Sequence, residues 1–147
     1  MSHHSELEFF NSLSGRLEIE LTGPTEQIGK LENVRATPDA QIKSLTLTAQ
    51  VYNRDSGTFR ELTSEELQSV AFRGAQIALR GESADTVTHQ SPNGEFFTVQ
   101  DMLNAVAETE RQTRAESEWF DGVDVHHVFF EGIRQSSDGV WLIYWGS

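Results

Sequence analysis

Alternating polar and apolar residues mark several stretches of the chain as strands. The pattern is clearest at 45–51, where every second residue is apolar. Strand side chains point alternately to opposite faces, so this spacing predicts a half-buried strand. The same alternation at 16–21 predicts a second one. Segments rich in β-branched, aromatic or other apolar residues predict further strands at 58–62, 75–80, 86–90, 125–134 and 140–145.

Short turn sequences separate these strands. Asp55-Ser56-Gly57 predicts a hairpin between the strand at 45–51 and its neighbour. Asn93-Gly94 tolerates the positive φ of a tight hairpin, so residues 95–97 are expected to pair back onto the preceding strand. Asp138-Gly139 predicts a two-residue type I′ turn between the last two strands.

Helical signals occur at both ends of the first half of the chain. Residues 5–13 place apolar side chains at helical spacing, which predicts a short N-terminal helix. Thr63 followed by Glu66 is a capping box, in which each side chain can accept a hydrogen bond from the other residue's backbone amide. We expect a short helix there, ending at about Val70.

The longest helix is expected at about 98–118. Its first half carries an apolar stripe of the kind that faces a core. Its second half instead carries Glu110, Arg114 and Glu118, spaced four residues apart. Exposed ion pairs at that spacing contribute about 0.2–0.5 kcal/mol each. The second half is therefore expected to stand in solvent or to meet a partner.

The order of these elements predicts an α+β fold. Strands follow one another without regular strand–helix–strand alternation, which argues against a parallel doubly wound sheet. We expect a mainly antiparallel sheet of about five to seven strands, with the long helix and one or two short helices packed on it. The last strand is apolar on both faces, which predicts a covered or strongly curved sheet. Without linkers or repeats, residues 1–147 fit a single domain.

The chain is strongly acidic, with a net charge of −12 from 11 Lys and Arg against 23 Asp and Glu. Proteins that bind nucleic acids neutralise phosphates with basic side chains, so a nucleic-acid partner is not expected. The same charge argues against anionic membranes. It favours solubility or a basic partner.

Cysteine is absent, which excludes disulfides, thiolate catalysis and Cys-based metal sites. The N-terminus lacks the basic region and apolar run of a signal peptide, and no stretch approaches the ~20 apolar residues of a membrane helix. We therefore expect a cytoplasmic protein without a membrane partner.

The segment from Asp124 to Glu131 holds the residues most suited to chemistry. On a strand, Asp124 and His126 would share one face about 6–7 Å apart, a spacing at which two side chains can bind one metal ion. His127 and Glu131 would share the other face, about 13 Å apart. Because histidine titrates near neutral pH, His126, His127 and Glu131 are candidate acid–base residues. The alternative is that these histidines are structural, as we expect for His89.

Aromatic residues gather toward the end of the chain. Four of them are candidates to line a groove for a sugar face, a planar ligand or a peptide: Trp119, Phe130, Trp141 and Trp145. The alternative is that they form the core, since aromatic side chains carry much of a small domain's burial. Of the four, Trp145 is the one most expected at a surface or pocket mouth.

Two functional hypotheses follow. There is no phosphate-binding loop, dinucleotide fingerprint, nucleophile elbow or zinc-protease motif, and we expect no cofactor. The first hypothesis is a non-catalytic binding or interaction module whose partner is a protein surface or a small apolar ligand. The second is a small enzyme or metal-dependent binder centred on Asp124, His126 and His127 near an aromatic-lined pocket. A homodimer is compatible with either.

Overall fold

The fold is that of a computed structural model, which describes residues 2–21, 42–81, 83, 85–114 and 127–146. The elements in chain order are α1 (Ser2–Asn11), β1 (Ser14–Leu21), β2 (Ile42–Asn53), β3 (Thr58–Glu61), α3 (Ser64–Gln68), β4 (Val70–Arg73), β5 (Gln76–Arg80), β6 (Thr86–Gln90), β7 (Phe96–Thr98), α4 (Val99–Thr113), β8 (Phe129–Gln135) and β9 (Trp141–Gly146).

Seven strands form one sheet in the order β3-β2-β1-β8-β9-β5-β6, and β4 pairs with β7 in a separate two-stranded sheet. The neighbours in the large sheet are antiparallel except for β5 and β9, which are parallel. This arrangement confirms the predicted α+β class with a mainly antiparallel sheet and one long helix.

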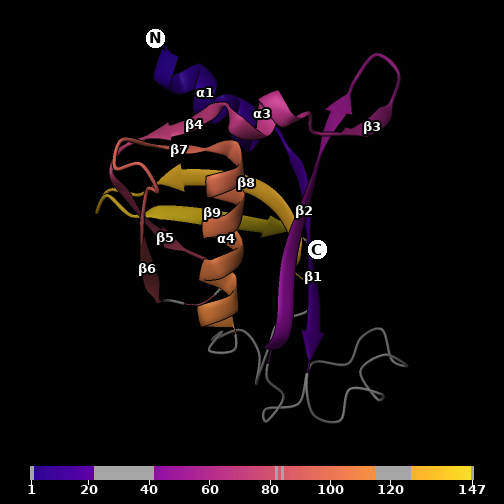
Figure 1. The fold of residues 1–147 in the computed structure, drawn as a ribbon. Helices are drawn as coiled ribbons and strands as arrows, with labels where there is room; N and C mark the ends of the chain where they lie inside the picture. The colour runs from indigo at the N-terminus through magenta and orange to yellow at the C-terminus, as the bar shows by residue number, and fades with distance from the viewer. Residues whose placement is uncertain (1, 22–41, 82, 84, 115–126, 147) are drawn as a thin grey trace.

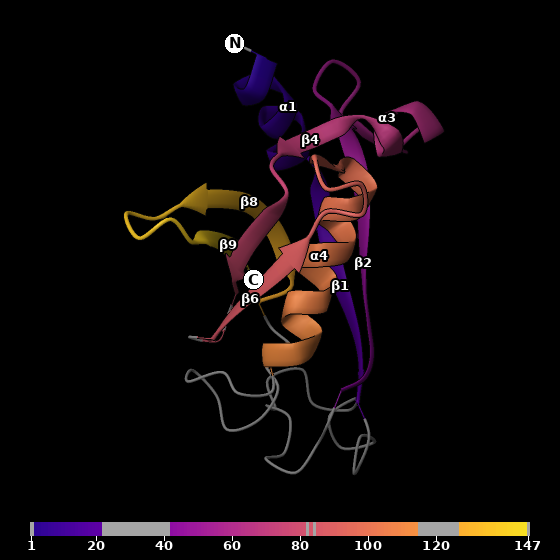
Figure 2. The same ribbon diagram turned by 60° about the vertical axis from the view of Figure 1, so that its left-hand side comes forward.

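The large sheet curves around α4, with β1 and β2 on one side of the helix and β5 and β6 on the other (Figures 1 and 2). The predicted apolar stripe of α4 faces this concave side, where Val99, Met102 and Val106 are 0% exposed. We call the concave side the inner face and the opposite side the outer face. The inner face contributes the buried apolar residues Leu17, Leu45, Ile77, Leu79, Ile133 and Ile143.

The first hairpin forms as predicted, and the second does not. β2 pairs with β3, and Gly57 in the turn has φ +68°. Gly94 also has positive φ, but β7 pairs with β4 instead of β6. The reason is that an unpredicted strand, β4 (Val70–Arg73), follows α3, which the sequence predicts to end at about Val70 and which ends at Gln68. The Gly74 amide then donates to the Glu95 carbonyl at 2.9 Å and draws that strand away from β6.

The last hairpin has a different turn from the predicted one. Its Ser136 amide donates to the Val140 carbonyl at 2.8 Å, which leaves three connecting residues. Of these, Gly139 has positive φ (+89°), and Asp138 does not. A type I′ turn needs positive φ at both central residues, so that prediction is wrong. Asp138 instead accepts hydrogen bonds from the Ser136 hydroxyl and the Val140 amide.

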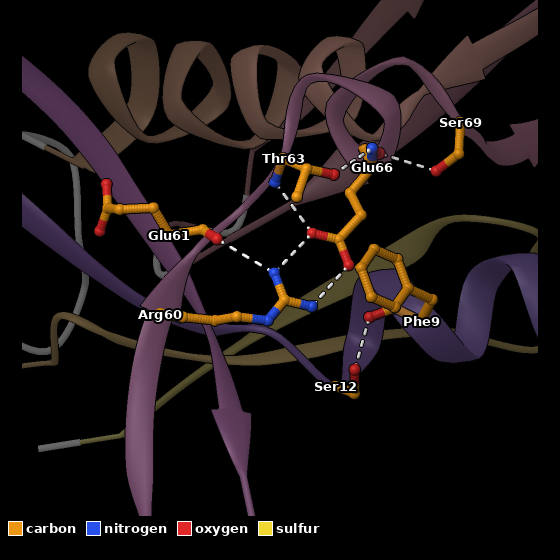
Figure 3. Close-up of polar contacts among 7 residues, drawn as sticks. All are labelled: Phe9, Ser12, Arg60, Glu61, Thr63, Glu66 and Ser69. Atoms are coloured by element: carbon orange, nitrogen blue, oxygen red, sulfur yellow. Dashed lines mark hydrogen bonds and ion pairs between the residues drawn. The ribbon is translucent and has the colours of Figure 1, made fainter.

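The capping box before α3 also ties this helix to the β2–β3 hairpin. Figure 3 shows Glu66 accepting from the Thr63 amide while the Thr63 hydroxyl accepts from the Glu66 amide, at 2.9 and 3.1 Å. Both Glu66 oxygens also accept from the Arg60 guanidinium of β3, each at 2.8 Å. These bonds, the one from Arg60 foremost, lower the pKa of Glu66 to about 2.

One side of the second half of α4 is buried, which corrects the expectation that this half stands in solvent, and Arg111 and Gln112 on its other side are exposed. Arg114 donates to Glu110 at 2.8 Å, and the two side chains are 0% exposed. The Trp145 indole donates to Glu110 at 2.9 Å, and the Arg114 guanidinium lies 5.1 Å from the Trp145 ring centroid. Gly81 leaves room for this pair, since a Cβ there would meet the Glu110 carboxylate. Glu118 lies outside the described residues.

Candidate functional site

The structure describes only part of the predicted metal and acid–base site. Asp124 and His126 lie outside the described residues, as does Trp119. His127 is half-buried just before β8, and Glu131 is exposed on β8. Within the described ranges, no group of three or more His, Asp or Glu side chains is placed to hold a metal ion. The roles assigned to these residues stay predictions.

The predicted aromatic residues that are described pack mainly on the inner face. Phe130 and Trp145 are 5% and 8% exposed, with ring centroids 5.8 Å apart. Trp141 is half-buried against Phe72, with ring centroids 5.4 Å apart. Trp145 therefore lies in the core and not at a pocket mouth, because alternation along β9 turns it toward α4 and Glu110. A ligand-binding role for these side chains stays a prediction.

The outer face of the sheet carries the exposed aromatic residues. In the part of the chain that the structure describes, four large apolar side chains are exposed: Tyr52 (45%), Phe59 (54%), Phe129 (45%) and Tyr144 (42%). Tyr52 and Phe59 are cross-strand partners on β2 and β3, with ring centroids 5.0 Å apart. Phe129 and Tyr144 follow on β8 and β9. All four alternate with inward-facing residues, so they share one surface, which we call the aromatic face.

A groove of about 400 Å³ crosses the aromatic face. Phe59 and Phe129 stand at its two sides, because β3 and β8 flank β2 and β1 in the sheet. Its lining is Ser14, Gly15, Arg16, Thr48, Gln50, Phe59, Phe129, Phe130 and Glu131. Two of these, Phe130 and Glu131, are among the residues that the sequence singles out.

Three charged side chains accompany the aromatic rings. The guanidinium of Arg16 lies 5.8 Å from the centroid of the Phe129 ring, and that of Arg134 lies 5.8 Å from the Tyr144 ring. Contacts of this kind contribute about 0.5–1 kcal/mol at exposed sites. Glu131 lies beside Gly146, where a Cβ would meet its carboxylate. Among the described residues, Arg16, Arg134 and Glu131 form no ion pair.

His89 has the surroundings expected of a structural histidine. Its Nε2 lies 2.7 Å from the hydroxyl of Thr109, a residue that is 0% exposed. The Thr109 hydroxyl donates its single hydrogen to the Ala105 carbonyl at 2.8 Å, so Nε2 of His89 is the donor to Thr109. Burial lowers the pKa of His89, which favours the neutral ring with its proton on Nε2. Thr109 is enclosed in the core and cannot act on a substrate.

No family model, curated protein or solved structure matches the chain. The aromatic face therefore has to be interpreted from its own geometry. A signal for it exists in the sequence, since Tyr52 stands at a position that the alternation of the 45–51 strand assigns to polar residues. Among the described residues, no helix is long and apolar enough to span a membrane.

Proposed function

We propose that the protein is an interaction module that binds a protein partner through the aromatic face. The observation that carries this proposal is the gathering of four exposed aromatic side chains on one side of the sheet. Contiguous exposed apolar surface marks interaction sites more often than isolated exposed residues do. Aromatic residues and arginine are also enriched at protein interfaces, and tyrosine and arginine among their energetic hot spots.

Arg16 and Arg134 strengthen this proposal through their positions. Each guanidinium lies over an exposed ring of the aromatic face. Neither forms an ion pair among the described residues, so each can pair with an anionic group of a partner. A partner that covers the rings would also remove water from these two guanidinium groups, and it would need to supply hydrogen-bond acceptors for them. Interfaces commonly surround such apolar anchors with a polar rim.

The test is affinity capture with matched variants. Phe59→Ser and Phe129→Ser remove rings from the aromatic face, and Thr88→Ala changes an exposed residue on β6 as the control. A captured protein counts only when, purified, it binds the wild type and the control equally and each Phe variant at least tenfold more weakly. If every purified partner binds all four proteins equally, the aromatic face is not the binding surface.

The groove favours small-ligand binding as a second candidate function. Its volume of about 400 Å³ falls in the range of small-molecule sites, roughly 300–1,000 Å³. Gln50, Thr48 and Ser14 supply amide and hydroxyl groups between the two rings. Native mass spectrometry of the purified protein would show a retained ligand as added mass, which Phe59→Ser should abolish. Added mass that survives this change would place the ligand elsewhere.

The enzyme alternative keeps its basis in the sequence alone. Asp124 and His126 lie outside the described residues, so the structure does not test this alternative. A metal-dependent role predicts that His126→Ala removes a bound metal or an activity and leaves the thermal midpoint unchanged. A lower midpoint with no loss of ligand would show a structural histidine.

A further inference from the structure

We infer that β6 is a docking edge for an extended basic segment of another protein, which pairs with β6 as an added strand and places lysine or arginine side chains over the groove between β6 and α4. β6 lies at the opposite end of the sheet from β3, so this surface is separate from the aromatic face and goes beyond the proposed function. Three features support the inference: the outward-directed backbone groups of β6, its uncharged side chains, and the carboxylates of the groove.

The backbone of β6 leaves one row of hydrogen-bonding groups without a strand beside it. β6 is the last strand of the large sheet, and among the described residues it pairs only with β5. The Ser91 amide donates to the Ala75 carbonyl at 2.8 Å, and hydrogen-bonded pairs alternate from there along the antiparallel ladder. Every second residue of β6 therefore bonds to β5, and the residues between them direct their amides and carbonyls away from the sheet. This outward-directed set is Thr86, Thr88 and Gln90.

The two edges of the large sheet differ in their side chains. β3 carries Arg60 and Glu61, and charged residues are a common means of keeping an edge strand from pairing with other chains. β6 reads Thr-Val-Thr-His-Gln, without proline, glycine, lysine, arginine or a carboxylate, and burial favours the neutral ring of His89. The β6 edge therefore lacks these protections, and extended peptides bind to such edges as added strands.

A groove of about 310 Å³ lies between β6 and α4, which stand beside each other in Figure 2. Pro92 and Ala105 give its lining apolar surface. Within the described residues, the lining holds the carboxylates of Asp101 and Glu108 and no lysine or arginine. Glu108 also pairs with Arg111, which lines the hollow on the other side of α4, toward β2. The groove beside the open edge is therefore acidic.

The edge and the groove together define the chemistry of the partner. A strand added to β6 lies about 4.8 Å from it, and every second side chain, about 6–7 Å apart, falls on the side of the groove. Lysine and arginine suit these positions, because their aliphatic stems can pack on apolar surface while their charged ends reach the carboxylates. The net charge of −12 also favours the approach of a basic segment.

The first test is the binding of a labelled, end-capped peptide of seven residues that alternates lysine with threonine, measured by fluorescence anisotropy in 0.15 M salt. At this salt concentration, general attraction to the acidic protein is screened beyond about 8 Å. The control is the same peptide N-methylated at every residue, which keeps the charges and loses all backbone donors. The unmethylated peptide should bind the full chain at least tenfold more tightly than this control.

Thr88→Pro is the decisive variant. Because the Thr88 amide points away from the sheet, proline leaves the β5–β6 ladder in place and removes a donor of the edge. It should weaken binding of the lysine peptide at least tenfold, whereas Thr88→Ala keeps the donor and should bind as the wild type does. The double variant Asp101→Asn, Glu108→Gln should also lose at least tenfold. Glu18→Gln, at an exposed site on β1, is its control.

Hydrogen exchange examines the same edge directly. In the free protein, the amides of Val87 and His89 should be protected by β5, and the Thr88 amide should exchange rapidly. Binding of the lysine peptide should then protect Thr88. A Thr88 amide that is already protected in the free protein would show that the edge is covered, and this would overturn the inference.

Other results would overturn it as well. The lysine peptide could fail to bind the wild type, or the N-methylated peptide could bind equally well. Unchanged binding to Thr88→Pro would exclude the edge, and binding lost in Phe59→Ser would place the peptide on the aromatic face. If Thr88→Pro melts at a lower temperature than Thr88→Ala, the N-methylated peptide and the double variant decide in its place.

Discussion

The two faces of the large sheet place polar and apolar groups in opposite ways. The inner face encloses the Glu110–Arg114 ion pair with 0% exposure, and the outer face leaves four aromatic side chains 42–54% exposed. Charged side chains are rarely buried unless paired, whereas a gathering of exposed aromatic residues is seldom needed for folding. The buried pair is therefore explained by its partners within the core, and the aromatic face calls for a partner outside.

Neighbouring residues Phe129 and Phe130 offer the largest contrast between the faces. Phe130 packs on Phe10 and Trp145, with ring centroids 5.3 and 5.8 Å away, so Phe130→Ala should lower the free energy of unfolding by about 3–5 kcal/mol. Phe129→Ala should lower it by no more than about 1 kcal/mol, because this ring is 45% exposed and loses chiefly its contact with Arg16. Urea denaturation, at concentrations that keep both variants monomeric, measures the difference. Equal losses would contradict the two-faced description.

Arg114 tests the buried pair on the inner face. Arg114→Met leaves the Glu110 carboxylate in the core without its cation and should destabilise the protein by about 3–5 kcal/mol. Arg111→Met on the same helix is the matched control, since Arg111 pairs with Glu108 and is 55% exposed. Exposed pairs contribute about 0–1 kcal/mol. Urea denaturation curves that shift equally for both variants would show that burial does not distinguish the pairs.

Asn11 tests what keeps the two faces in register along β8. Its side chain accepts from the Ile133 amide at 2.9 Å and donates to the Ile133 carbonyl at 3.1 Å, next to Gly132 with φ +97°. The register of β8 against β9 shifts between Phe130 and Ile133, and this shift lets both side chains face inward although they are three residues apart. Asn11→Ala should lower stability by about 1–3 kcal/mol. Hydrogen exchange at the Ile133 amide should accelerate, and Ser12→Ala, at an exposed neighbouring side chain, should leave it unchanged.

The smallest effect is expected at the exposed edge of the sheet and depends on pH. The pKa of Glu66 falls from 4.5 to about 2 on folding, chiefly because Arg60 donates to its carboxylate. The unfolded chain therefore takes up a proton first, and this contribution to stability is present above pH 4.5 and disappears as the pH falls toward 2. Melting curves of wild type and Glu66→Gln should converge over that range, with Glu65→Gln as the control. A constant difference would argue against the Arg60 contact.

Local patterns predict the elements of this fold better than their partners. The strand at 45–51, the capping box of Thr63 and Glu66 and the apolar stripe after residue 98 follow from residues close together in the sequence, and β2, α3 and α4 form there. The pairing of β7 with β4 does not follow, because a turn such as Asn93-Gly94 favours a hairpin whichever strand the chain finally meets. Tertiary contacts such as Gly74 with Glu95 decide it.

The burial of individual side chains is no easier to predict from local sequence. Glu110 and Arg114 have a spacing that suits an exposed pair and a buried one equally, and it is Trp145, 35 residues away from Glu110 in the sequence, that encloses them. Phe129 and Phe130 are likewise indistinguishable until the register of β8 against β1 is known. Alternation along a strand indicates that the sheet has two faces. Which face is the interior is decided by the helix that packs on it.

The position of β9 bears on how the chain reaches this structure during synthesis. β9 follows every other strand in sequence, yet it lies between β8 and β5. Until it emerges from the ribosome, the sheet consists of two unconnected pieces, β3-β2-β1-β8 and β5-β6, each with an open edge. Such edges invite pairing with other chains. The nascent protein should therefore remain dependent on chaperones until β9 has emerged, and it should gain protease resistance in a single late step.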